Sequence, residues 1–222
     1  RFRYFYPFSI IPKYIRELLG FGWRYLPSGM FLVVIPFTNR LFITNLLGVE
    51  ETSLYAIAES LSMMLYLLVV GFMHAWQPWL FQKLAGHDEH GMEDVRQSCV
   101  LFVLGMPLAG IAMSVVAHYA VPYLLGTDFH AAGIYVLPLM MMVSALGTFQ
   151  LSQTFLHFHQ RVGWMSVSST AAMILNGVIG WFFIQWFGVA GAAWATVAAY
   201  MTATLLGTYV IFRRPPSRGA GH

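Results

Sequence analysis

Two oppositely charged residues, Arg40 and Glu59, stand inside apolar stretches of the sequence. Arg40 lies about nine residues before the centre of the short break at 48–52, and Glu59 lies about nine residues after it. In an antiparallel helix pair with a rise of 1.5 Å per residue, both fall roughly 13 Å from the turn. A lone charge in lipid costs several kcal/mol, so we expect the two to form an ion pair. The pair is either a structural clasp, or part of a hydrated cavity in which Arg40 contacts an anionic substrate.

Other polar side chains recur at helical spacing within three of the apolar stretches. Each one alone is most simply explained by an interhelical hydrogen bond, but the joint pattern favours a polar interior shared by three helices. With the charged pair, they form our set of candidate cavity-lining, substrate-binding residues. The set is Arg24, Ser28, Asn39 and Arg40 in the first stretch, Tyr55, Glu59, His74 and Gln77 in the second, and Gln150, Gln153 and His157 in the fourth.

The elements that must position these residues are membrane helices. Of 222 residues, 58% are hydrophobic and 9% are charged, whereas a soluble domain carries about 25% charged residues. Apolar stretches of about 20 residues or more predict transmembrane helices. We therefore predict an all-α integral membrane protein with a six-helix lobe at 17–212, a cytoplasmic linker at 1–16 and a cytoplasmic tail at 213–222. The expected helices run from Glu17 or Pro27 to Leu47, then over 53–84, 97–125, 131–158, 162–187 and 189–212.

The distribution of basic residues orients the predicted helices. Eleven of the 12 Lys and Arg residues fall on one side of the membrane, Arg40 being the exception, while the opposite side holds Glu50, Glu51 and Asp128. Lys and Arg collect in cytoplasmic loops. We therefore expect both termini to be cytoplasmic and the protein to lie in the inner (cytoplasmic) membrane. The chain begins at Arg1 without a methionine, and we expect a fragment of a larger protein.

Prolines and small residues give two weaker structural signals. Pro36, Pro78, Pro107 and Pro138 lie inside predicted helices, where proline bends a helix; this suits a cavity but is also ordinarily tolerated in membranes. The last helix carries small residues four apart, which let one face approach a neighbour closely. They are Gly191, Ala195, Ala199, Ala203 and Gly207.

Several functional classes lack sequence support. The sequence has no phosphate-binding glycine loop, nucleophile elbow or zincin motif, so we expect no enzymatic activity. The scattered net charge of +3 does not suggest nucleic-acid binding. Cys99 stands alone, which excludes a disulfide within the chain. His157 and His159 point to different helix faces, so we expect no metal site shared by them. We also expect no cofactor.

Four segments, taken in order, resemble the C-terminal half of polysaccharide flippases. They are NRLFITNLLGVEETSLYAIAESLSMML, HAWQPWLFQKL, YAVPYLLGTDFHAAGIYVLPLMM and ILNGVIGWFFIQWFGVAGAAWAT. The first is similar to the helix pair that opens that half, the second to a proline-bearing helix end, the third to a Leu-Leu-Gly turn. The fourth is similar to an Asn-bearing helix followed by a Gly turn and a small-residue helix. The resemblance covers about residues 17 to 212.

The resemblance implies membership of the lipid-linked oligosaccharide flippases, within the multidrug/oligosaccharidyl-lipid/polysaccharide exporter superfamily. It implies two six-helix lobes, of which this chain would be the C-terminal one, with the N-terminal lobe missing. The implied cargo is an undecaprenyl-pyrophosphate-linked oligosaccharide, contacted together with membrane lipid and moved by alternating access, with Na⁺ or H⁺ as a possible coupling ion. The first, second and fourth helices would face the central cavity. Asn39 departs from the acidic residue that usually precedes Arg40, which leaves Glu59 as the partner of that arginine.

Two alternatives remain open at this point. One is a multidrug or cation antiporter of the same superfamily, which an acidic ion site would favour; Glu59 is the only carboxylate within the predicted spans, which counts against it. The other is a membrane enzyme, such as a glycan polymerase or acyltransferase, which would need a large outer loop. The predicted outer loops are very short.

Overall fold

The computed structural model describes residues 12–86, 89–125 and 133–213 as six long helices. All six are long and apolar enough to cross a membrane, and the chain is an all-α integral membrane protein. The helices are α1 (Pro12–Leu47), α2 (Val49–Gly86), α3 (Glu89–Leu125), α4 (Gly133–Phe158), α5 (Val162–Phe187) and α6 (Val189–Arg213).

Helix boundaries agree with the predicted ones within a few residues in α2, α4, α5 and α6, but α1 and α3 begin earlier than expected. α3 begins at Glu89 rather than Gln97, so part of the expected polar loop is helical. The predicted linker at 1–16 overlaps the first turn of α1, which starts at Pro12. Proline suits that position, because the first residues of a helix have no hydrogen-bond partner for their N–H groups. The rest of the predicted linker, and the tail after Arg213, lie outside the described residues. Pro27 and Pro36 both lie inside α1.

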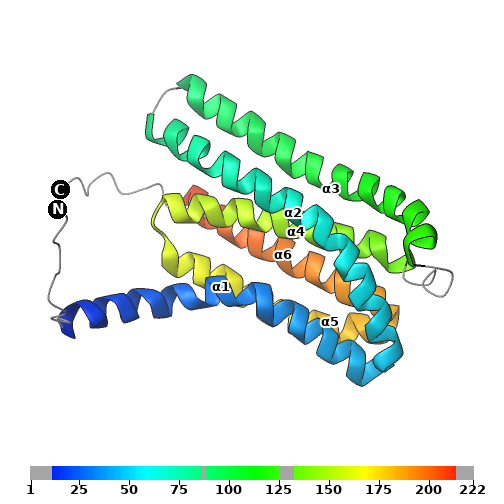
Figure 1. Ribbon diagram of the computed structural model, residues 1–222. Helices are drawn as coiled ribbons and strands as arrows, with labels where there is room; N and C mark the ends of the chain where they lie inside the picture. Colours follow the sequence, from blue (N-terminus) through cyan, green and yellow to red (C-terminus); the bar gives the residue numbers. More distant parts are fainter. Residues whose placement is uncertain (1–11, 87–88, 126–132, 214–222) are drawn as a thin grey trace, which may run out of the picture.

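The helices pack as an antiparallel bundle with α4 and α6 in the middle (Figure 1). α1 and α5 lie along one side, and α2 and α3 lie along the other. α4 is largely buried, whereas α3 exposes most of its apolar side chains. A helix that is apolar on its exposed faces suits contact with lipid, so α3 sits at the edge of the bundle where lipid covers it.

A single glycine makes the turn between α1 and α2. Gly48 has φ of +101°, a left-handed conformation that favours glycine. Its N–H lies 3.2 Å from the carbonyl oxygens of both Ile43 and Thr44, closing the end of α1. Across the turn, the hydroxyls of Thr44 and Thr52 are 2.9 Å apart. The two helices therefore meet tightly at this end and diverge toward the other (Figure 1).

The small residues predicted to form a close-packing stripe on α6 do so. Ala195, Ala199 and Ala203 are fully buried. At Gly191, an added Cβ would collide with the backbone carbonyl of Phe183 on α5. Small side chains therefore bring α6 against its neighbours at backbone distance, as in other membrane helix pairs.

Candidate functional site: a polar pocket between α1, α2 and α4

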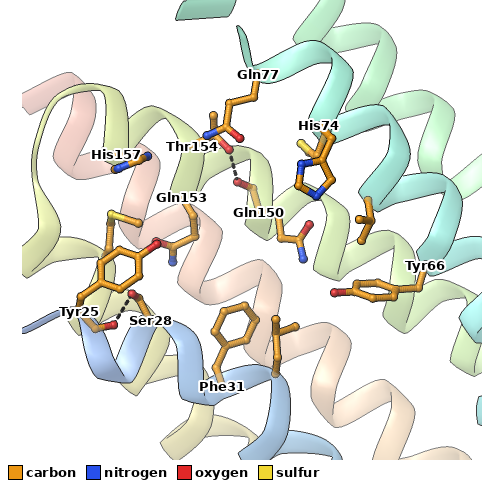
Figure 2. Close-up of a pocket in the computed structure, with 14 residues that line it drawn as sticks. Tyr25, Ser28, Phe31, Tyr66, His74, Gln77, Gln150, Gln153, Thr154 and His157 are labelled. Carbon is orange, nitrogen blue, oxygen red and sulfur yellow. Dashed lines mark hydrogen bonds between the residues drawn. The ribbon is translucent and has the colours of Figure 1, made fainter. Parts of the chain in front are cut away.

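An open polar pocket of about 300 Å³ lies where α1 and α2 diverge, with α4 behind it. Figure 2 shows its 14 lining residues. Six of the eleven predicted site residues line it, and they come from the three helices on which the polar stripes were recognised. These six are Ser28, His74, Gln77, Gln150, Gln153 and His157.

Gln153 is the most constrained polar residue of the pocket. Its side-chain nitrogen donates to the hydroxyls of Ser168 at 3.0 Å and Ser169 at 3.3 Å, both on α5. These two bonds fix the orientation of the amide. The residue is only 8% exposed, and its Oε1 is buried with no hydrogen-bond partner among the described residues. Gln153 therefore anchors the wall of the pocket to α5.

Aromatic rings close the inner side of the pocket. Phe31 of α1 lines it and packs edge-on against Phe149 of α4, with ring centroids 5.2 Å apart. Phe149 in turn stacks on Tyr200 of α6 at 5.5 Å. Such offset and edge-to-face pairs are favourable arrangements for aromatic rings. The cluster ties three helices together beneath the polar side chains.

Among the residues that the structure describes, the pocket wall carries no acidic, lysine or arginine side chain. Charged groups of the same end of the bundle are engaged with each other or with backbone: Lys83 pairs with Asp94 at 2.8 Å, and Arg161 donates to the carbonyl oxygen of Val210 at 2.7 Å. Burial lowers the pKa of the nearby His159, and Arg161 lowers it further. The described part of the pocket wall is therefore polar and carries no acidic or basic side chain other than histidine.

The predicted ion pair between Arg40 and Glu59 is confirmed. Arg40 Nε and Nη2 lie 3.0 and 2.6 Å from the same carboxylate oxygen, Oε2 of Glu59. The two side chains differ sharply in exposure, at 52% for Arg40 and 2% for Glu59. The pair clasps α1 to α2, as one of the two interpretations requires, and it also leaves half of the guanidinium available to a ligand.

The ion pair lies apart from the polar pocket, nearer the Gly48 turn. Neither Arg40 nor Glu59 lines that pocket. Glu59 instead lines a second cavity of about 110 Å³, and the two hollows share Leu32 and Tyr66. The predicted polar interior is thus a pocket and a smaller cavity in succession along the bundle.

Asn39 and Tyr55 do not reach the pocket, although both were predicted to line a cavity. Asn39 is fully buried; its side-chain nitrogen donates to the hydroxyl of Thr196 at 3.0 Å, and its oxygen accepts from Asn176 at 2.9 Å. Thr196 also donates to Asn176 at 2.7 Å. The reason is that α1 packs more extensively against α5 than against α2, and the Asn39 side of its polar stripe faces α5 and α6. Tyr55 is likewise fully buried in the core.

Sequence reasoning omitted three polar residues of the pocket, Tyr25, Tyr66 and Thr154. Tyr66 could have been found, because it stands two turns before His74 and three before Gln77 on the same stripe of α2. The hydroxyl of Thr154 donates to the carbonyl oxygen of Gln150 at 3.0 Å, so its hydrogen is already bonded within α4. Arg24 lies within α1, but its side chain falls outside the described part of the structure. His87 and Asp88, between α2 and α3, also lie outside the described residues.

Comparison with known proteins finds a similar membrane protein but no matching family. No family profile matches the chain, and no solved structure matches it. A protein of Haemophilus influenzae named "Uncharacterized membrane protein" is 23% identical over 145 residues, which cover 64% of this chain. The matched region spans 35% of that relative, so the chain corresponds to about a third of its length.

Proposed function

We propose that this chain forms one wall of a transporter that moves a lipid-linked oligosaccharide across the cytoplasmic membrane. In this proposal the cargo is an undecaprenyl-pyrophosphate-linked glycan, the chain acts without covalent chemistry, and a second lobe supplies the facing wall. Both termini lie in the cytoplasm, as the distribution of basic residues predicts.

The observation that carries the proposal is the open polar pocket between α1, α2 and α4, whose described wall presents amide, imidazole and hydroxyl side chains from three helices. Sugars present hydroxyls that both donate and accept hydrogen bonds, and the pocket offers amides and hydroxyls together with the ring of Phe31.

Charge supports a glycan over the cargo of a multidrug antiporter. An organic cation is best held by a carboxylate, yet no Asp or Glu lines the polar pocket. The diphosphate of a lipid-linked glycan instead matches Arg40, whose Nη1 makes no bond to any described residue and whose guanidinium suits phosphate oxygens. The polar pocket would hold sugar and Arg40 would attract the diphosphate, with the lipid tail remaining in the bilayer.

Binding to the purified chain in lipid nanodiscs tests the proposal. A diphosphate-linked oligosaccharide lipid should bind, and the same lipid diphosphate without sugar should bind more weakly. Gln150→Leu should weaken binding of the sugar-bearing lipid about tenfold, corresponding to the loss of one or two hydrogen bonds. Gln185→Leu, the same change at an exposed position of α5, is the matched control. Equal affinity for the lipid with and without sugar would contradict the assignment of the pocket.

A further inference from the structure

The carboxylate of Glu59 is satisfied on one oxygen only. Both donors of Arg40 point to Oε2, while Oε1 is buried with no partner among the described residues. The hydroxyl of Tyr55, one helical turn earlier on α2, is also buried without a hydrogen-bond partner there. A buried, half-paired carboxylate is unusual, because such groups normally accept bonds on both oxygens.

The cavity of about 110 Å³ beside Glu59 is lined mainly by hydrocarbon. Besides Glu59, the polar side chains in its wall are Tyr66 and Tyr200. It adjoins the open polar pocket through Tyr66, whose hydroxyl points into that pocket (Figure 2). Leu32 and Tyr66, which line both hollows, therefore lie between the polar pocket and the cavity beside Glu59.

The composition of this cavity selects what can occupy it. A hard metal cation is held by several oxygen ligands, and here the wall offers one carboxylate and two phenol hydroxyls among apolar groups. A proton needs one oxygen only. The titratable and charged groups that face Glu59 are Arg40 from α1, Tyr55 and Tyr66 from α2, and Tyr200 from α6, while α4 contributes only Met142, Val143 and Leu146.

The charge of Glu59 therefore depends on Arg40 alone among the described residues. Arg40 is half exposed and can turn toward an anion, whereas Glu59 cannot leave the interior. A buried carboxylate that loses its counter-charge is strongly disfavoured and becomes neutral by taking a proton. Release of Arg40 and protonation of Glu59 are thus linked by the difference in burial between the two partners.

We propose that Glu59 is a proton-binding site that fills when Arg40 engages an anionic ligand. Arg40 exchanges Glu59 for phosphate oxygens and stays a guanidinium cation. A water-borne proton passes from the polar pocket to Glu59, where an O–H bond forms as the bond to the donor water breaks. The anion replaces the carboxylate as the counter-charge of Arg40, and the proton neutralises the carboxylate that Arg40 has left. The ligand's identity as a diphosphate rests on the proposed function; the proton site does not.

Infrared difference spectroscopy of Arg40→Gln in nanodiscs tests the proton site without any cargo. At neutral pH this variant should show a protonated-carboxyl band that wild type lacks and that Arg40→Gln/Glu59→Gln also lacks. Its thermal stability should be higher in acid than in alkali, because only the neutral acid tolerates burial without Arg40. A folded Arg40→Gln protein that lacks the band, or whose stability rises with pH, would overturn the inference.

Calorimetry on wild type then tests the link to the anion, with inorganic pyrophosphate as the probe. Titrations in two buffers of different ionisation enthalpy report binding and proton uptake together. Wild type should take up close to one proton more per bound pyrophosphate than Glu59→Gln does. Binding with equal uptake in the two proteins would overturn the inference. Absence of binding in both would count against the diphosphate site of the proposed function, and the infrared result would still decide the proton site.

Discussion

Asn176 of α5 donates a hydrogen bond of 2.9 Å to the side-chain oxygen of Asn39 on α1, although 137 positions separate them in the chain. Thr196 of α6 accepts a hydrogen bond from Asn39 and donates one to Asn176, so the three side chains form a closed ring. All three residues are essentially fully buried. The triad joins three helices by polar contacts in the interior of the bundle, and such interhelical bonds stabilise membrane bundles.

Asn176→Leu should therefore lower the free energy of unfolding by about 1–3 kcal/mol, because it leaves the buried side-chain oxygen of Asn39 without its donor. Thermal denaturation of the chain in detergent, followed by size-exclusion chromatography, measures the loss. Asn45→Leu makes the same change at an exposed position of α1 and should have little effect. Equal stability of the two variants would show that the triad contributes nothing net.

Gly191→Ala should prevent normal folding, since an added Cβ would meet the backbone carbonyl of Phe183, which cannot move without displacing α5. We expect a strong reduction in the amount of folded protein in membranes, measured by fluorescence-detected chromatography. Gly71→Ala on α2 is the control, because a Cβ there has open space around it. Normal yield of Gly191→Ala would mean that α5 and α6 pack less closely than described.

The ion pair should respond asymmetrically to the loss of its two partners. Glu59→Gln leaves a cation whose long side chain is half exposed and can reach toward the membrane surface, so it should cause the smaller loss of stability. Arg40→Gln leaves a buried carboxylate and should reduce stability several-fold more at neutral pH. Chemical or thermal unfolding of both variants decides this, and a larger loss from Glu59→Gln would contradict the burial difference.

Arg40→Lys separates the clasp from a contact with the ligand. Lysine keeps the positive charge beside Glu59 but lacks the planar fork that binds two phosphate oxygens. We expect near-normal membrane abundance with about tenfold weaker binding of a diphosphate lipid. Unchanged affinity in Arg40→Lys would reduce Arg40 to a structural role.

The topology is testable with single cysteines in a Cys99→Ala background. Cysteines at Glu50 and Gln82 lie at opposite ends of α2, and both positions are exposed. An impermeant thiol reagent added to intact cells should label position 50 and spare position 82 until the membrane is opened. Labelling of both from outside would exclude the expected orientation.

The sequence by itself determined the helices and the depth of the charged residues. Long apolar stretches in a chain with few charges leave helices as the structure that satisfies the backbone in lipid. A short turn at Gly48 then fixes which residues of α1 and α2 share a depth, so the partnership of Arg40 and Glu59 followed from counting residues on each side of the turn.

Only the tertiary structure decided which polar face meets which neighbour. Ser28 and Asn39 share one stripe of α1, yet Ser28 lines the pocket and Asn39 binds Asn176 and Thr196. Helical periodicity sets the angle between residues on one helix, but not the rotation of that helix against others. That rotation comes from close packing of small residues on α6 and from the divergence of α1 and α2, which depend on contacts between segments far apart in the chain.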